Sequence, residues 1–85
     1  MDISRAEQRI LHILAQGGSI HIEKDGAGRI VALSCITRDS WRFPGVDLAL
    51  FRKVKRKRAI ASSHGGPYPI TRRGLELVRS QPDNR

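Results

Sequence analysis

The first residues combine a helix-start signal with apolar positions at helical spacing. Ser4 and Glu7 have the spacing of a capping box, in which each side chain accepts a hydrogen bond from the other residue's backbone N–H. At about 100° per residue, the apolar side chains fall within one arc. Gly17 and Gly18 then favour a stop, because glycine adopts the left-handed conformation of a helix C-terminus without steric penalty. The pattern predicts an amphipathic helix over about residues 4–16. Its inward face is expected to consist of Ile3, Ala6, Ile10, Leu11, Ile13 and Leu14.

Polar and apolar residues alternate with period two after the glycine pair. Ile20 and Ile22 are separated by polar side chains, as a half-buried strand requires, and a more apolar run follows a glycine-containing turn. We therefore expect a hairpin with strands at 19–24 and 29–36 around a turn at 25–28. The second strand, being more apolar, is expected to be the inner one.

The middle of the chain predicts a second helix after an ambiguous stretch. Residues 38–46 mix turn formers with large apolar groups, so their pattern leaves strand and loop open. Asp47 can cap a helix that runs to about Arg58. The apolar face of this helix consists of Leu48, Leu50, Phe51 and Val54.

The last third predicts another hairpin and a final helix. Residues 60–63 and 68–70 flank a glycine-containing turn, and the prolines nearby cannot donate ladder hydrogen bonds. The return strand should therefore be short and lie at an edge. Thr71 can cap a helix that ends before Pro82. The side chains expected to face the core are Leu75 and Val78.

The element order helix, hairpin, helix, hairpin, helix predicts a single small α+β domain that is winged-helix-like in its second half. The 85 residues bury roughly 60–65% of their unfolded surface, which suffices for one small core. We expect one domain over residues 1–85, with an ordered core over about 3–80 and a loose C-terminal tail at 81–85. The early hairpin departs from the usual winged-helix order, in which helices come first.

The formal charge of +8 is concentrated in the second part of the chain. Residues 1–51 hold six Lys or Arg side chains against six Asp or Glu, whereas residues 52–85 hold ten against two. The protein is therefore basic in one local patch, which indicates an anionic partner.

The predicted second helix carries most of this charge. Its basic side chains include like-charged pairs four residues apart, which destabilise an isolated helix slightly and which an anionic partner would offset. Charge alone does not distinguish nucleic-acid phosphate from an acidic protein surface. The helix offers no Asn or Gln for reading bases, so a DNA contact here would be dominated by phosphate attraction. The primary binding candidates are Arg52, Lys53, Arg56 and Lys57, and the secondary candidates are Lys55, Arg58, Trp41, Arg72 and Arg73.

Catalytic chemistry finds little support in the residue pattern. Cys35, the only candidate nucleophile, lies in the most apolar predicted strand, where a small buried side chain is the common use. The three histidines lack metal-ligand spacing, and Gly65-Gly66 lacks the Lys-Ser/Thr of a phosphate loop. We expect no catalytic residue, metal, cofactor or small-molecule substrate.

The compartment follows from what the chain lacks. No apolar run, Ile30 to Leu33 included, exceeds four residues, so no membrane-spanning segment is expected. The first residues include an acid and no apolar signal core, and the single cysteine excludes an internal disulfide. These features favour the cytoplasm.

Several short motifs resemble the YjhX family of small bacterial toxins from end to end. They are Ser4-Arg5, Glu7-Gln8-Arg9, Leu11-His12, Leu14-Ala15, Gly17-Gly18, Pro67-Tyr68, Gly74-Leu75, Val78-Arg79 and Asp83-Asn84-Arg85, and the likeness is weakest over 38–46. The resemblance implies a toxin of a toxin–antitoxin pair that inhibits bacterial DNA topoisomerase I. It also implies an acetyltransferase-like antitoxin encoded beside it.

Two functions are therefore open. The first is a non-catalytic inhibitor that either covers the DNA-binding surface of topoisomerase I or binds DNA beside the enzyme and blocks the complex. The second is a winged-helix DNA-binding regulator. The inhibitor would bind through the basic helix or through the loop that contains Trp41, whereas the regulator would use the basic helix to bind DNA.

Overall fold

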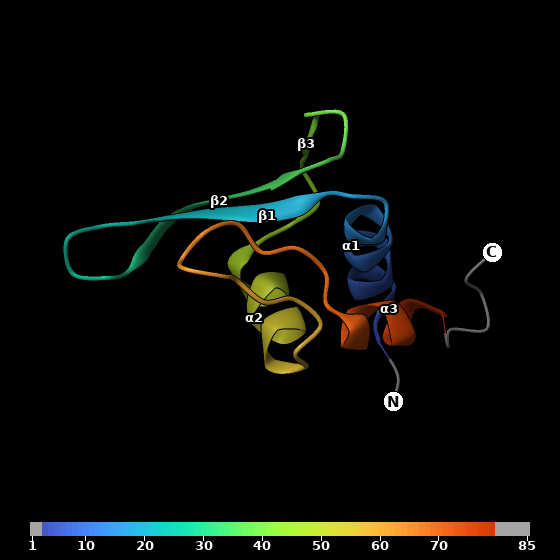
Figure 1. Cartoon of the computed structure of the whole chain (residues 1–85). Coiled ribbons are helices and arrows are strands. Elements are labelled where there is room, and N and C mark those ends of the chain that lie inside the picture. The colour runs from blue at the N-terminus through green and yellow to red at the C-terminus, as the bar shows by residue number, and fades with distance from the viewer. Residues whose placement is uncertain (1–2, 80–85) are drawn as a thin grey trace.

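The computed structural model describes residues 3–79, which form an α+β domain with three helices and a three-stranded antiparallel sheet. The predicted tail at 81–85 and the helix end near Pro82 lie outside the described residues. In chain order the elements are α1 (Arg5–Ala15), β1 (Ser19–Lys24), β2 (Ile30–Ile36), β3 (Arg42–Phe43), α2 (Leu48–Arg56) and α3 (Arg72–Arg79). Figure 1 shows the β1–β2 hairpin extending past the helices, which lie below the sheet in this view.

Helix α1 begins and ends as its sequence predicts. The Glu7 N–H donates to Ser4 Oγ (3.1 Å), and the Ser4 N–H donates to Glu7 Oε1 (2.9 Å), which completes the capping box. At the other end Gly17 has a φ of +107°, and the Gly18 N–H donates to the Ile13 carbonyl, as in a Schellman motif. Ala6, expected on the inner face, is exposed.

The β1–β2 hairpin forms where it was expected, within one residue of the predicted bounds. Ile20 pairs with Cys35 and Ile22 with Leu33, so the alternating apolar residues share one face. Strand β2 is the central strand, as predicted. Its apolar content does not mean full burial, however, because the helices lie on one side of the hairpin and Val31 is 62% exposed.

The ambiguous stretch after β2 resolves into a turn and a short strand. β3 pairs with the end of β2 through Cys35–Phe43 and Ile36–Arg42. The turn between them is closed by the Thr37 N–H, which donates to the Trp41 carbonyl (2.7 Å). The sequence left strand and loop open here, because two paired residues leave no period-two pattern.

The expected second hairpin is reduced to isolated bridges, so the predicted element order is met only in part. Ile60 pairs with Ile70, and Tyr68 pairs with Ile20 on the edge of β1. The prolines on either side of Tyr68 have no N–H to donate, which prevents a longer ladder. The returning chain therefore covers one edge of the main sheet, and residues 57–71 are paired by isolated bridges and not by a continuous ladder.

Caps fix the other two helices. The Leu50 N–H donates to Asp47 Oδ1 (2.8 Å) at the start of α2, as predicted. α2 ends at Arg56 and not at Arg58, because Arg58 adopts a left-handed conformation with a φ of +59°. Thr71 caps α3 by accepting from the Gly74 N–H (3.1 Å).

One hydrophobic core joins the three helices to the near end of the sheet. Gly74 lies so close to the chain after α2 that a Cβ there would overlap the Ala59 carbonyl oxygen. Of the side chains predicted to face inward from α3, Val78 is buried and Leu75 is half-buried, and Leu77 joins them. The buried hydrophobic residues of this core are Ile3, Ile10, Leu11, Leu14, Ile20, Cys35, Leu50, Phe51, Val54, Ala59, Ile60, Leu77 and Val78.

Candidate functional site

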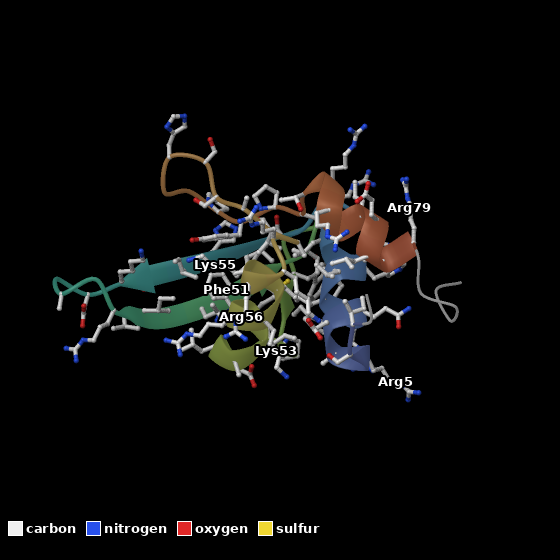
Figure 2. All side chains as sticks on the ribbon, turned by 90° about the horizontal axis from the view of Figure 1, so that it is seen from below. Arg5, Phe51, Lys53, Lys55, Arg56 and Arg79 are labelled. Atoms are coloured by element: carbon white, nitrogen blue, oxygen red, sulfur yellow. The ribbon has the colours of Figure 1, made fainter. Side chains whose placement is uncertain are left out.

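Helix α2 presents three cations to solvent on the side away from its core stripe. Burial of Leu50 and Val54 fixes the rotation of the helix, which leaves Arg52, Lys53 and Arg56 exposed. α2 has no acidic residue, and within residues 3–79 no ion pair involves these three side chains. Figure 2 views the molecule from below and labels Lys53 and Arg56 on α2. We call Arg52, Lys53 and Arg56 the α2 cation face.

Lys57, the fourth primary candidate, is engaged in the fold. Its Nζ lies 2.7 Å from Glu7 Oε2 on α1, and the side chains of Lys57 and Glu7 are 25% and 4% exposed. Lys57 is the C-cap residue of α2 and follows its last turn. The structure therefore separates the predicted four-residue set into three solvent-facing cations and one that links two helices.

The electrostatics of Glu7 follow from this ion pair. Burial raises the pKa of the Glu7 carboxyl, but the hydrogen bonds from Lys57 and Ser4, together with the Lys57 charge, lower it by more. The net pKa of Glu7 lies below its ordinary value of 4.5. The carboxylate is therefore ionised at neutral pH and holds α2 against α1.

Lys55 lies over two aromatic rings. Its Nζ is 5.8 Å from the Phe51 ring centroid and 5.7 Å from that of Tyr68, within the range of a cation–π contact. The two rings meet edge to face with their centroids 5.1 Å apart. Lys55 remains exposed, so this arrangement positions a charge at the surface between α2 and the 57–71 segment.

The remaining secondary candidates fall into two groups. The Thr71 hydroxyl donates to the Arg58 carbonyl (2.7 Å), which brings Arg58 beside the start of α3, where Arg72 is exposed. Arg73 is exposed as well and lies 3.9 Å from Glu76. Trp41 is 74% exposed in the β2–β3 connection, which Figure 1 shows on the side of the sheet opposite α2. The structure therefore does not bring Trp41 together with the α2 cation face.

Cys35, the nucleophile candidate of the sequence, does not reach the surface. Cys35 is fully buried, and burial raises the pKa of its thiol to about 11. Residues 3–79 contain no cluster of three or more His, Cys, Asp or Glu side chains able to hold a metal ion. No helix among them is long and apolar enough to cross a membrane.

Fold and surface together define a small α+β domain in which one short helix, α2, displays cations and carries no acidic residue. The sequence model of the YjhX toxin family, described as "Putative toxin of bacterial toxin-antitoxin pair", matches residues 1–85. The chain belongs to this family, as the sequence motifs indicated.

Close relatives span the same length. The chain is 78% identical over 85 residues to a UPF0386 protein of Chelativorans sp. (strain BNC1), with both chains fully covered. It is 67% identical over 84 residues to a UPF0386 protein of Hyphomonas neptunium, with 99% of each chain covered. A UPF0386 protein of Rhizobium johnstonii is 66% identical over 85 residues, again with both chains fully covered. No solved structure matches.

Proposed function

We propose that the chain is a toxin that inhibits bacterial DNA topoisomerase I by binding through the α2 cation face, without catalysis. The observation that carries the proposal is the display of Arg52, Lys53 and Arg56 on a helix with no acidic residue. Family membership supports the toxin class. The specific target comes from the YjhX resemblance.

Charge favours one of the two routes of inhibition. A surface that binds DNA is itself basic, so a second basic face would be repelled from it. DNA beside the enzyme carries the opposite sign and would attract the α2 cation face. We therefore favour a blocked complex in which the toxin contacts DNA next to topoisomerase I.

A plasmid relaxation assay with purified topoisomerase I tests this proposal. Replacing Arg52, Lys53 and Arg56 together with Gln should raise the inhibitory concentration about tenfold or more, because three phosphate-facing charges are lost. The matched control replaces Arg5, Arg9 and Arg79 with Gln, three exposed cations outside α2, two of which Figure 2 labels away from it. Lys57 is left unchanged because its loss would perturb the fold.

Two results would contradict the proposal. The wild-type chain in several-fold molar excess over the enzyme could leave relaxation unaffected, which would remove topoisomerase I as the target. Alternatively, the α2 variant and the control variant could lose inhibition equally. That result would show that inhibition depends on the total positive charge of the protein and not on the position of the α2 cation face.

The second candidate function is a winged-helix DNA-binding regulator, and the same cation face favours it. The logarithm of its DNA affinity should fall with the logarithm of salt concentration by about 0.9 per phosphate neutralised. The α2 triple variant should flatten this slope by up to about 2.7, whereas the control variant should leave it unchanged. Tight, sequence-selective binding without topoisomerase inhibition would favour this function over the first.

A toxin of a toxin–antitoxin pair requires an antitoxin. From the resemblance we propose an acetyltransferase-like protein as this partner. Co-expression followed by co-purification tests the complex, and addition of the partner to the relaxation assay should restore topoisomerase activity. A partner that co-purifies without restoring activity would contradict an antitoxin role.

A further inference from the structure

A second surface lies between α2 and the overhanging part of the β1–β2 hairpin. Figure 1 shows that the hairpin continues beyond α2. Residues of the hairpin and of α2 line a hollow of about 540 Å³. We call it the hairpin groove. It is separate from the turn region at Trp41, which lies on the other side of the sheet.

The floor of the hairpin groove is aliphatic. Ile22 and Ile30 come from the two strands, and Leu48 comes from the first turn of α2. All three are half-buried, so they pack against the core on one side and still meet solvent on the other. Contact with an apolar partner would remove this remaining surface from water, which is favourable.

The rim of the hairpin groove is cationic. Lys24, Arg52 and Lys55 are exposed along it, and within residues 3–79 none of them takes part in an ion pair. Arg29 also lines the groove but is bonded to Asp25, with its Nε 3.2 Å from Asp25 Oδ2. Among the described residues no carboxylate lines the groove.

These two features specify the chemistry of an occupant. An apolar floor calls for hydrophobic side chains, and a rim of cations without ion pairs calls for carboxylates beside them. Bases of a nucleic acid would need an exposed ring for stacking, but Phe51, the aromatic residue of the groove, is only 1% exposed. A second copy of this chain is disfavoured by its charge of +8.

We propose that the hairpin groove binds an acidic, amphipathic polypeptide segment, whose large apolar side chains lie on the floor while its carboxylates meet the rim. The proposal does not depend on topoisomerase I being the target. Its natural source would be a partner protein, recognised by the alternation of acidic and apolar residues.

Selection from a display library of short random peptides, with the full chain immobilised, tests the groove. Peptides that combine Asp or Glu with large apolar residues should be enriched, and their binding is then measured by fluorescence anisotropy near physiological ionic strength. Charges beyond about 8 Å are screened there, so local contacts dominate. A single-stranded oligonucleotide serves as competitor.

The variants place the peptide in the groove. Arg52→Glu and Lys24→Glu should each weaken binding about fivefold or more, because each reverses a rim charge. The matched control Arg5→Glu reverses an exposed cation on α1, outside the groove and labelled away from α2 in Figure 2, and should alter binding less than about twofold. Leu48→Ser should weaken binding as well, and its unchanged circular dichroism would show that it still folds.

Each remaining outcome overturns the proposal. No enrichment, or enrichment of acidic peptides without apolar residues, would remove the groove as a peptide site. Equal losses for Arg52→Glu and Arg5→Glu would indicate diffuse attraction. Displacement of the peptide by the oligonucleotide from a variant with Lys53 and Arg56 replaced by Gln, which keeps the groove but weakens the α2 cation face, would indicate a nucleic-acid site. Lys24 lies outside the α2 cation face, so Lys24→Glu distinguishes failure of the groove from failure of the inhibitor proposal.

Discussion

At the scale of single residues, the contact between Glu7 and Lys57 separates a structural cation from the binding candidates. Lys57 and the three residues of the α2 cation face belong to one run of basic residues and look equivalent in the sequence. Of these four, only Lys57 is paired with a buried carboxylate among the described residues. Charge counting located the basic helix correctly. It could not identify Lys57 as structural, because its partner lies 50 residues earlier in the chain.

Loss of Lys57 should destabilise the fold. Lys57→Met leaves the buried Glu7 carboxylate without its counter-ion and should lower the free energy of unfolding by about 2 kcal/mol. The loss of stability would be larger if the ion pair were fully buried, but a quarter of the Lys57 side chain is exposed. Urea unfolding measures the effect. Arg56→Met, the exposed control, should change the stability by less than about 0.5 kcal/mol. Equal effects for the two variants would contradict a structural role for Lys57.

Acid should remove the contribution of Glu7 to stability. Its pKa is lower in the folded chain than its ordinary value of 4.5, so the folded state holds the proton less tightly than the unfolded chain does. The stabilisation is therefore fully present above pH 4.5 and is lost as the pH falls through the lowered pKa. Urea unfolding across this pH range should show the advantage of the wild type over Glu7→Gln shrinking in acid. A constant difference would refute the ion-pair explanation.

At the scale of elements, local signals predicted most helix ends and the first hairpin. Ser4 with Glu7, and Asp47, act within three residues of their partners, so the sequence shows them directly. The pairing of Tyr68 with Ile20 is long-range and leaves no local pattern. The hairpin groove could not be predicted for the same reason, since it depends on how the hairpin lies over α2.

The end of α2 gives a prediction about stability. The Ala59 N–H donates to the Val54 carbonyl (3.0 Å) and the Arg58 N–H to that of Lys55 (3.0 Å), a Schellman motif with Arg58 in the left-handed position that glycine prefers. Arg58→Gly should therefore raise the free energy of unfolding by about 0.5–1 kcal/mol, after the extra entropy of glycine in the unfolded chain is subtracted.

Arg58→Ala is the matched control, since it removes the same side chain but keeps the left-handed strain. Chemical unfolding should show a gain for Gly and none for Ala. If both variants lose topoisomerase inhibition, the guanidinium group of Arg58 contributes to binding, independently of the effect of the backbone conformation on stability. A destabilised Arg58→Gly variant would show that the Arg58 side chain contributes more to the fold than its exposure indicates.

At the scale of the whole molecule, the structure distributes potential contacts over three regions. The α2 cation face and the hairpin groove adjoin at Arg52, whereas Trp41 lies across the sheet from both. The concentration of basic residues predicted the α2 cation face. The hairpin groove could not be predicted in this way, because Lys24 belongs to residues 1–51, which carry no net charge. Lys24 lies far from Arg52 and Lys55 in the sequence, so only the structure shows that the three line the same groove.

The fluorescence of the exposed Trp41 can report on which side of the sheet a partner binds. It is the only tryptophan in the sequence, and its side chain is largely in water in the folded state. Its fluorescence should therefore respond weakly to unfolding but should shift to the blue when a macromolecule covers the β2–β3 side of the sheet. A ligand that occupies only the α2 side should leave the emission unchanged. One titration without any attached dye would thus report which side of the sheet a given partner approaches.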